Sequence, residues 1–259
     1  MESIYRFSEP EILAFAMMLI RVSTFVVAWP IFGVESVPAS VKILFALMVT
    51  FLIFPAVEWQ NLTASFGSSQ LIWLSVKEAF IGVMFGFLAR MFLMATRVAG
   101  ELVSLALGLS GAQLYNPAMG GMSSPLDQFF FALAGLVFLS INGHHLFLMG
   151  LVDTFRIIPM GPELLSMSPL LSIGEIVQDI VIIGIKISAP VMMSILVVNM
   201  VMGILGKTVP QINVLITSLA VNVLVGLVVL ILALPLMVGE VPDLLETSAN
   251  RLFQIVKAM

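Results

Sequence analysis

Ser110, His144 and His145 are the residues whose types could support catalysis in this sequence. Gly-Leu-Ser-Gly at residues 108–111 matches the short G-x-S-G motif of intramembrane serine proteases, in which a histidine base activates the serine for acyl transfer. A working pair needs the serine at a helix start and the histidine on a packed helix, whereas loop-forming residues follow Ser110. We therefore interpret Ser110 as part of a polar turn at the membrane interface and expect no enzymatic activity.

The two histidines do not predict a metal site either. Adjacent residues on a helix point about 100° apart, and no thiol or carboxylate near His144 and His145 completes a ligand set. The chain has no cysteine, and it carries no Walker A, GxGxxG or HExxH motif. We expect neither a metal nor a cofactor.

Six ionisable residues within apolar stretches fall into two groups at helical spacing: Arg90, Arg97, Glu101, Glu175, Asp179 and Lys186. Each group of three lies on one face of a helix, and Arg97 and Glu101 form an i, i+4 pair. A charge at membrane depth costs about 2.5–3.5 kcal/mol, so such groups face protein or water. A proton relay is one interpretation. Because no run of carboxylates continues across the membrane, we favour polar seams that face neighbouring helices, aqueous vestibules or other subunits.

The composition predicts a polytopic membrane protein. Of 259 residues, 60% are apolar and 10% are charged, against about 25% charged in soluble domains. The eleven lysines and arginines are scattered singly and the net charge is −4, so we expect no nucleic-acid partner. The N-terminus lacks the pattern of a cleaved signal peptide, and the basic residues leave the topology open.

Six apolar segments approach the roughly 20 residues that cross a bilayer, and they extend over about Ile12–Phe32, Val41–Val57, Leu71–Ala95, Phe129–Leu151, Ile176–Leu205 and Val209–Val238. They are apolar on all sides, unlike barrel strands, so we predict an all-α integral membrane protein with long helices in hairpins. Prolines 30, 55 and 190 are expected to bend or end helices. We divide the chain into residues 1–152, a hairpin at 153–239 and a short amphipathic helix at 240–259.

Residues 108–125 form an uncharged stretch rich in glycine and proline between two apolar segments. Dipeptides such as Gly120-Gly121 and Asn116-Pro117 interrupt regular structure. Met119 and Met122 add soft side chains that pack adaptably. A flexible backbone with such side chains is typical of a movable plug. The alternative is a plain connecting loop.

Four stretches resemble the FliR family (FliR/SctT) of bacterial type III export gates, in the family's order and over essentially the whole chain: RVSTFVVAWPIFG, GLSGAQLYNPAMGGMSSPLDQFF, NGHHLFLMGLVDTFRIIPMG and TVPQINVLITSLAVNVLVGLVVLILALPLM. The third stretch favours the flagellar branch over the virulence injectisomes. The chain departs from the family pattern at Ser218, Ala220 and Asn222, where the family carries Gly, Pro and Lys.

The resemblance implies a subunit that closes a helical hetero-oligomer with FliP and FliQ in the bacterial inner membrane, at the flagellar basal body, with FlhB and FlhA nearby and membrane lipid around it. Unfolded flagellar proteins would pass through it. Residues 1–152 would be FliP-like and 153–239 FliQ-like, and the assembled helices would lie largely above the membrane plane.

The resemblance also implies that the loop at 108–125 plugs the pore, through Gly108, Gly111, Leu114, Tyr115, Pro117, Met119, Gly120, Gly121 and Met122. Three other functions remain open at this point, namely an injectisome gate subunit, a stand-alone membrane transporter and an intramembrane protease.

Overall fold

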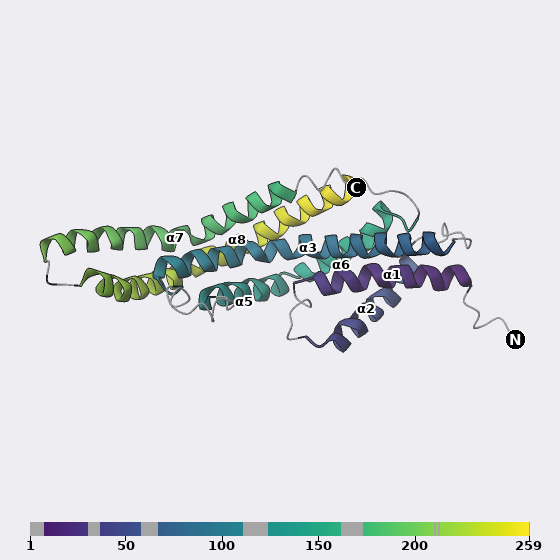
Figure 1. The fold of residues 1–259 in the computed structure, drawn as a ribbon, viewed down its shortest axis with the longest axis horizontal. Coiled ribbons are helices and arrows are strands. Elements are labelled where there is room, and N and C mark those ends of the chain that lie inside the picture. Colours follow the sequence, from purple (N-terminus) through teal and green to yellow (C-terminus); the bar gives the residue numbers. More distant parts are fainter. Residues whose placement is uncertain are drawn as a thin grey trace. The chain divides into compact units, whose positions relative to one another are not determined.

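The computed structural model of the chain describes residues 8–30, 37–57, 67–110, 124–161, 173–209, 211 and 213–258, none of which lies in a β-strand. Figure 1 shows their helices, which are α1 (Glu9–Ala28), α2 (Ala39–Ile53), the short 3-10 helix η1 (Phe54–Ala56), α3 (Ser68–Leu107), α5 (Pro125–Ser140), α6 (Gly143–Ile157), α7 (Ile173–Thr208) and α8 (Val214–Ala258). Five helices are long and apolar enough to cross a membrane, or six spans if α5 and α6 count as one broken span. The predicted all-α integral membrane protein is confirmed.

Local sequence signals set both ends of the first helix. At the start of α1, Glu11 N donates to Ser8 Oγ and Ser8 N donates to Glu11 Oε2, at 3.4 and 2.7 Å. This reciprocal capping box satisfies two backbone donors that have no partner within the helix. The helix ends at Ala28, because Pro30 disfavours helical dihedrals at the residue before it.

The fourth predicted span, Phe129–Leu151, is wrong as a continuous helix. It breaks at Ile141 and Asn142, and Asn142 adopts the left-handed conformation with φ 57°, which asparagine tolerates better than most residues. Helix α6 then begins at Gly143, directly before His144 and His145. The helix before the break starts four residues earlier than predicted, because Ser124 caps it and Pro125 occupies its first turn.

Helices α7 and α8 both continue through prolines that lie inside them. Helix α7 continues through Pro190, and Figure 1 shows it changing direction about midway. The separate amphipathic helix expected at 240–259 is wrong, because α8 continues through Pro235 and Pro242 to Ala258. Membrane helices tolerate prolines where neighbouring groups satisfy the freed backbone. The third span is also longer than predicted, since α3 passes Ala95 and ends at Leu107.

The chain divides into two compact units, each drawn from separate stretches. Unit 1 contains Met1–Met91, Asn142–Gly174 and Ser248–Met259, and unit 2 contains Phe92–Ile141 and Glu175–Thr247. This spatial division differs from the one made along the sequence at 152 and 239. The latter concerns likeness to FliP and FliQ and stays a prediction.

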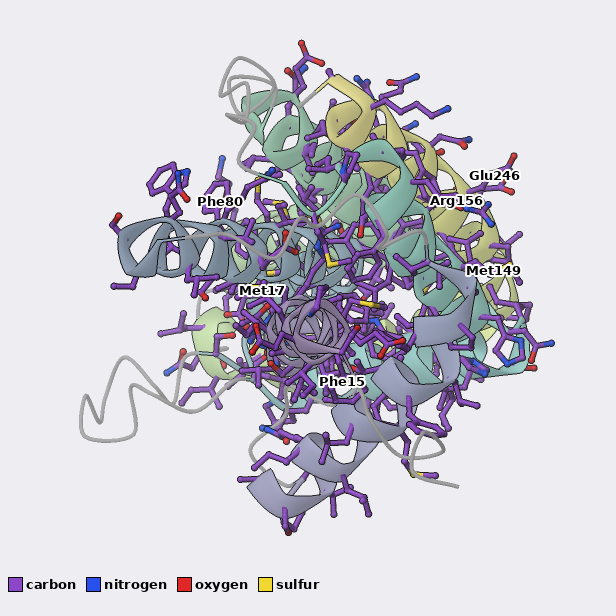
Figure 2. All side chains as sticks on the ribbon, turned by 90° about the vertical axis from the view of Figure 1, so that its right-hand side faces the viewer. Phe15, Met17, Phe80, Met149, Arg156 and Glu246 are labelled. Carbon is purple, nitrogen blue, oxygen red and sulfur yellow. The ribbon has the colours of Figure 1, made fainter. Side chains whose placement is uncertain are left out.

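In unit 1, α3 packs closely against α1 through two glycines one turn apart. A Cβ at Gly82 would collide with Thr24 and with the backbone oxygen of Arg21, and one at Gly86 would lie 2.6 Å from the Ala28 Cβ. Small residues four apart let membrane helices approach in this way. Figure 2 shows Met17 pointing among the helices and Arg156 pointing away from them, with exposed fractions of 4% for Met17 and 72% for the Arg156 side chain.

Unit 2 has an apolar core drawn from α3, α5, α7 and α8, formed by Ala99, Val103, Leu107, Leu126, Phe130, Ile187, Val191, Ile195, Leu230, Ala233 and Met237. Gly184 lies against Val98, and Gly226 lies against Leu107, so both helices of the α7–α8 hairpin approach α3 closely. Across the hairpin, Asn222 Nδ2 donates to Asn199 Oδ1 at 3.0 Å.

Candidate functional site

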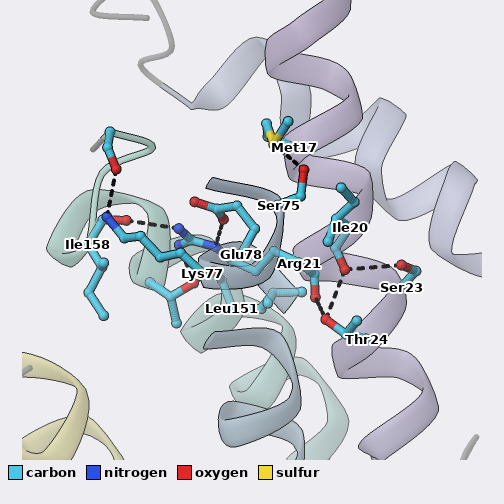
Figure 3. A network of polar contacts seen from close by, with 12 residues as sticks. Met17, Ile20, Arg21, Ser23, Thr24, Ser75, Lys77, Glu78, Leu151 and Ile158 are labelled. Atoms are coloured by element: carbon cyan, nitrogen blue, oxygen red, sulfur yellow. Dashed lines mark hydrogen bonds and ion pairs between the residues drawn. The ribbon is translucent and has the colours of Figure 1, made fainter. Parts of the chain in front are cut away.

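A fully buried ion pair lies at the centre of unit 1 (Figure 3). Arg21 Nε of α1 donates to Glu78 Oε2 of α3 at 2.5 Å, and both side chains are 0% exposed. The same guanidinium donates to Thr154 Oγ1 at 3.3 Å and to the Ile158 carbonyl at 3.0 Å. Its Cζ atom lies 4.1 Å from the centre of the Phe155 ring. Arg21 therefore joins three segments that lie far apart in the sequence.

A second buried cation binds the same segment after α6. Lys77, with an exposed fraction of 4%, donates through Nζ to the Gly161 carbonyl at 2.9 Å. Arg21 binds the carbonyl of the C-cap residue Ile158, where the helix end carries a partial negative charge, and Lys77 binds the chain just beyond that end. The sequence analysis assigned no role to Arg21, Lys77 or Glu78. The sequence signal that could have identified Lys77 and Glu78 is a pair of adjacent opposite charges inside an apolar segment.

The ion pair of unit 2 has a different geometry. Arg97 Nε of α3 lies 3.5 Å from Asp127 Oδ1 of α5, and the two side chains are 37% and 10% exposed. Neither atom has a hydrogen-bond partner among the described residues. The Arg97 guanidinium also covers the Phe131 ring, with Cζ 4.5 Å from its centre. Part of the Arg97 side chain is exposed, but Asp127 and both paired atoms are buried, so this is not a surface ion pair.

The first turn of α5 lies directly on α3 beside this pair. A Cβ added at Gly100 would lie 2.7 Å from both the Leu126 carbonyl oxygen and the Asp127 Cα. Asp127 N donates to Ser124 Oγ at 3.1 Å, which caps the helix. The sequence interpretation missed Asp127. Its signal was an acidic residue three positions after a capping serine, where the helix dipole favours a negative charge.

The other end of the 108–125 stretch is also anchored on α3. Gly108 has φ +78°, and Leu109 N donates to the Ser104 carbonyl at 2.9 Å while Gly108 N donates to the Leu105 carbonyl at 3.0 Å. This is a Schellman motif, which needs a residue such as glycine in the left-handed conformation. Ser110 Oγ lies 3.1 Å from Ser104 Oγ and 3.2 Å from Glu101 Oε1.

The structure places only part of the predicted plug. Gly108 lies in the turn just described, whereas Gly111, Leu114, Tyr115, Pro117, Met119, Gly120, Gly121 and Met122 lie outside the described residues. The plug assignment therefore stays a prediction.

The residues of the predicted polar seam differ in how far they are exposed. Arg90 and Lys186 are exposed, whereas Arg97, Glu101 and Asp179 are partly buried. Arg97 faces Asp127, Glu101 accepts a hydrogen bond from Ser110, and among the described ion pairs none joins Arg97 to Glu101 as their i, i+4 spacing had indicated.

Ser110 and the two histidines, the candidate catalytic and metal-binding residues, belong to different units of the chain. Ser110 bonds to Glu101 and Ser104 in unit 2, whereas His144 and His145 belong to unit 1, where their rings lie 4.2 Å apart. Within the described residues, no group of three or more His, Asp or Glu side chains is placed to hold a metal ion.

Comparison with known proteins gives one family. The family model of bacterial export proteins, family 1, matches residues 12–248. The chain is 30% identical to flagellar biosynthetic protein FliR of Bacillus subtilis (strain 168) over 246 residues, 92% of this chain and 94% of that protein. It is 30% identical to FliR of Escherichia coli (strain K12) over 241 residues, 93% and 92% of the two chains. FliR of Aquifex aeolicus (strain VF5) is 27% identical over 231 residues, 88% of each chain.

Proposed function

Because this chain belongs to the family of bacterial export proteins, family 1, and is similar over nearly its whole length to FliR proteins, we propose that it is a non-enzymatic membrane component of the flagellar export apparatus. In this proposal it is a structural and gating subunit in the inner membrane at the flagellar basal body. It forms part of a pore wall with FliP and FliQ, near FlhB and FlhA, and unfolded flagellar proteins leave the cell through that pore.

The exposed apolar surface of α7 is the observation that carries the subunit role. Large apolar side chains are exposed from Val177 to Leu205, a stretch that is about 42 Å long at 1.5 Å per residue. A hydrocarbon core of about 30 Å covers about 32 Å of a helix at the average tilt of about 20° and about 39 Å at a tilt of 40°. At the average tilt, lipid alone leaves part of this surface uncovered, and in the proposal neighbouring protein helices cover that part.

An exposed lysine within the same stretch supports this assignment. Lys186 is exposed on α7 between Val177 and Leu205, and a charge that faces hydrocarbon is costly. A protein neighbour or a water-filled passage accommodates the charge better than lipid does. The same argument disfavours a stand-alone transporter, whose outer surface faces lipid throughout.

In the proposal, residues 108–125 form the plug of the pore. Both ends of this stretch are anchored on the last turns of α3, by the Gly108 turn at one end and by the first turn of α5 at the other. The sequence between these two anchors carries no charge. Met119 and Met122 would close the resting channel to ions, because methionine packs adaptably.

Two experiments test the proposal. Co-expressed FliP and FliQ should co-purify with this chain, whereas recovery of an active transporter without them would contradict the subunit role. Deletion of residues 110–122 should raise the resting ion conductance of the assembled complex in cells. Unchanged conductance in a complex that still assembles would remove the plug role. A Ser110→Ala variant that assembles but loses a proteolytic activity would instead favour an intramembrane protease.

A further inference from the structure

We infer that α8 leaves its apolar surroundings at Gly239, and that the exposed face of its C-terminal part, residues 240–258, is in contact with water in the assembled complex. The inference goes beyond the proposed function, because it divides the surface of one continuous helix in two. Lipid and neighbouring subunits cover the first part, whereas the second part stays open to soluble molecules.

Before Gly239, the exposed face of α8 is apolar. Every exposed residue between Leu219 and Leu236 is apolar, and Leu224 and Leu232 are 68% and 73% exposed. The residues of this face are Leu219, Ala220, Leu224, Leu227, Val228, Ile231, Leu232, Pro235 and Leu236. A continuous apolar surface of this kind is stable only against lipid or another apolar surface.

After Gly239, the exposed face of α8 is polar, and no large apolar side chain is exposed in the described part of the chain beyond Leu236. Glu240, Asp243 and Glu246 place three carboxylates on two turns of this face. Each charge costs about 2.5–3.5 kcal/mol at membrane depth, so lipid does not cover them. Among the described residues, none of the three is in an ion pair, so a protein that covered them would have to supply the cations. The exposed residues of the C-terminal part are Glu240, Pro242, Asp243, Glu246, Thr247, Asn250, Gln254, Lys257 and Ala258.

The length of α8 leads to the same conclusion independently. At 1.5 Å per residue, its 45 residues are about 68 Å long. A hydrocarbon core of about 30 Å covers about 39 Å of a helix even at a tilt of 40°. That length corresponds to about 26 residues, which is the extent of α8 from Val214 to Gly239. Part of the helix must therefore lie outside hydrocarbon, and the polar face identifies it as the part from Glu240 onward.

The apolar side of the C-terminal part packs within the protein. Leu252 is 2% exposed, and the Phe253 ring lies against α6 at Gly150, where an added Cβ would be 2.9 Å from it. An amphipathic helix that binds a membrane surface places its apolar side in lipid, but here α6 occupies part of that side. Farther along α6, the Arg156 side chain is 72% exposed and points away from the helices (Figure 2). The polar side of α8 therefore faces outward from unit 1.

Single cysteines test the boundary directly, because the chain has none of its own. The probe is a membrane-impermeant maleimide, applied to membrane fragments that are open on both sides and contain the complex co-expressed with FliP and FliQ. We expect Asn250→Cys and Gln254→Cys to label readily. Leu224→Cys and Leu232→Cys should label at least about tenfold more slowly, because the maleimide reacts with the thiolate, which apolar surroundings disfavour. Labelling after denaturation gives the total amount of each variant.

Three further variants sharpen the test. Leu236→Cys and Glu240→Cys lie about one turn apart on the same face, on either side of Gly239, so only Glu240→Cys should label fast. Leu252→Cys replaces a buried side chain between the exposed Asn250 and Gln254, so it should label only after denaturation. Rapid labelling of Leu252→Cys in the native complex would contradict the packing of the C-terminal part on unit 1.

Two results would overturn the inference. If Asn250→Cys and Gln254→Cys label as slowly as Leu232→Cys in the complex, lipid or another protein covers the C-terminal part. If Leu232→Cys labels as fast as Asn250→Cys, α8 has no boundary at Gly239. Failure of FliP and FliQ to co-purify refutes the proposed function instead, and the same labelling in membranes that contain this chain alone still tests the boundary.

Discussion

Arg21 and Arg97 both stack on a phenylalanine ring and both face a carboxylate, yet their surroundings differ. The Arg21–Glu78 pair is 2.5 Å long with both side chains 0% exposed, and Arg21 makes two further hydrogen bonds. The Arg97–Asp127 pair is 3.5 Å long, with Arg97 37% exposed and no hydrogen bond from the paired atoms in the described residues. One arginine joins three segments of unit 1, and the other touches a single helix turn in unit 2.

The difference shows how one residue type serves two purposes in the same chain. Removing one partner of a buried pair leaves an uncompensated charge and costs about 3–5 kcal/mol, so unit 1 is held in one arrangement. The Arg97–Asp127 pair is longer and makes no hydrogen bond between its paired atoms, so it fixes α5 against α3 less tightly. Unit 2 instead gains its stability from the apolar core between α3, α5, α7 and α8.

The largest effect is expected from removal of the buried carboxylate of Glu78, which tests the contrast between the two ion pairs. Glu78→Ala leaves Arg21 buried without its counter-ion and should lower the free energy of unfolding by about 3–5 kcal/mol. The measurement is the thermal unfolding of the detergent-solubilised protein. The double variant Arg21→Met/Glu78→Leu should recover part of the loss, because apolar side chains replace both charges. Equal effects of Glu78→Ala and Asp127→Asn would contradict the contrast between the units.

A smaller effect is expected from the glycine contact that brings α3 onto α1 in unit 1. Gly82→Ala places a methyl group against Thr24 and the backbone of Arg21, and overpacking of this kind costs about 1–3 kcal/mol. The control is Gly203→Ala in α7, where no atom lies within 4 Å of the added methyl. The same unfolding assay should show Gly203→Ala unchanged or stabilised. If the two alanine variants behave alike, close packing does not hold unit 1.

The smallest effect should come from the polar contact across the hairpin of unit 2. Asn222→Leu removes the hydrogen bond to Asn199, and such bonds between membrane helices contribute about 0.6 kcal/mol on average. Asn222 Oδ1 has no partner within the described residues, so its removal offsets part of the loss. Asn199→Leu should cost more in the unfolding assay, because it leaves both polar groups of the buried Asn222 side chain unpaired. A loss as large as that of Glu78→Ala would show that unit 2 also depends on buried polar contacts.

Much of the helical framework was predictable from local signals. Five of the six predicted apolar segments correspond to long helices, and the resemblance to the FliR family is confirmed over residues 12–248. The errors concern helix boundaries, and they occur where one short sequence signal was interpreted by itself. Ser124-Pro125 was interpreted as a loop signal, but a serine followed by proline also starts a helix, and here it starts α5.

The boundary of the C-terminal helix was also predicted wrongly. Residues 240–259 were predicted to form a short amphipathic helix after the last apolar segment, whereas α8 continues through both regions to Ala258. Its last turns do alternate buried and exposed residues, with Leu244, Leu252 and Val256 buried. The amphipathic pattern was correct, and the boundary was wrong because the helix continues unbroken from the apolar part into the amphipathic part.

The amino-acid sequence by itself determined that this chain forms apolar helices, because a backbone surrounded by hydrocarbon must satisfy its hydrogen bonds within its own segment. It also determined the family. Only the tertiary structure decided which charges meet. Arg21 faces Glu78 across 57 residues of sequence, and Arg97 faces Asp127 instead of Glu101 four residues away. These pairings depend on how each helix is rotated against its neighbours, and closely packed glycines such as Gly82 and Gly100 allow the helix backbones to approach closely enough for the charges to meet.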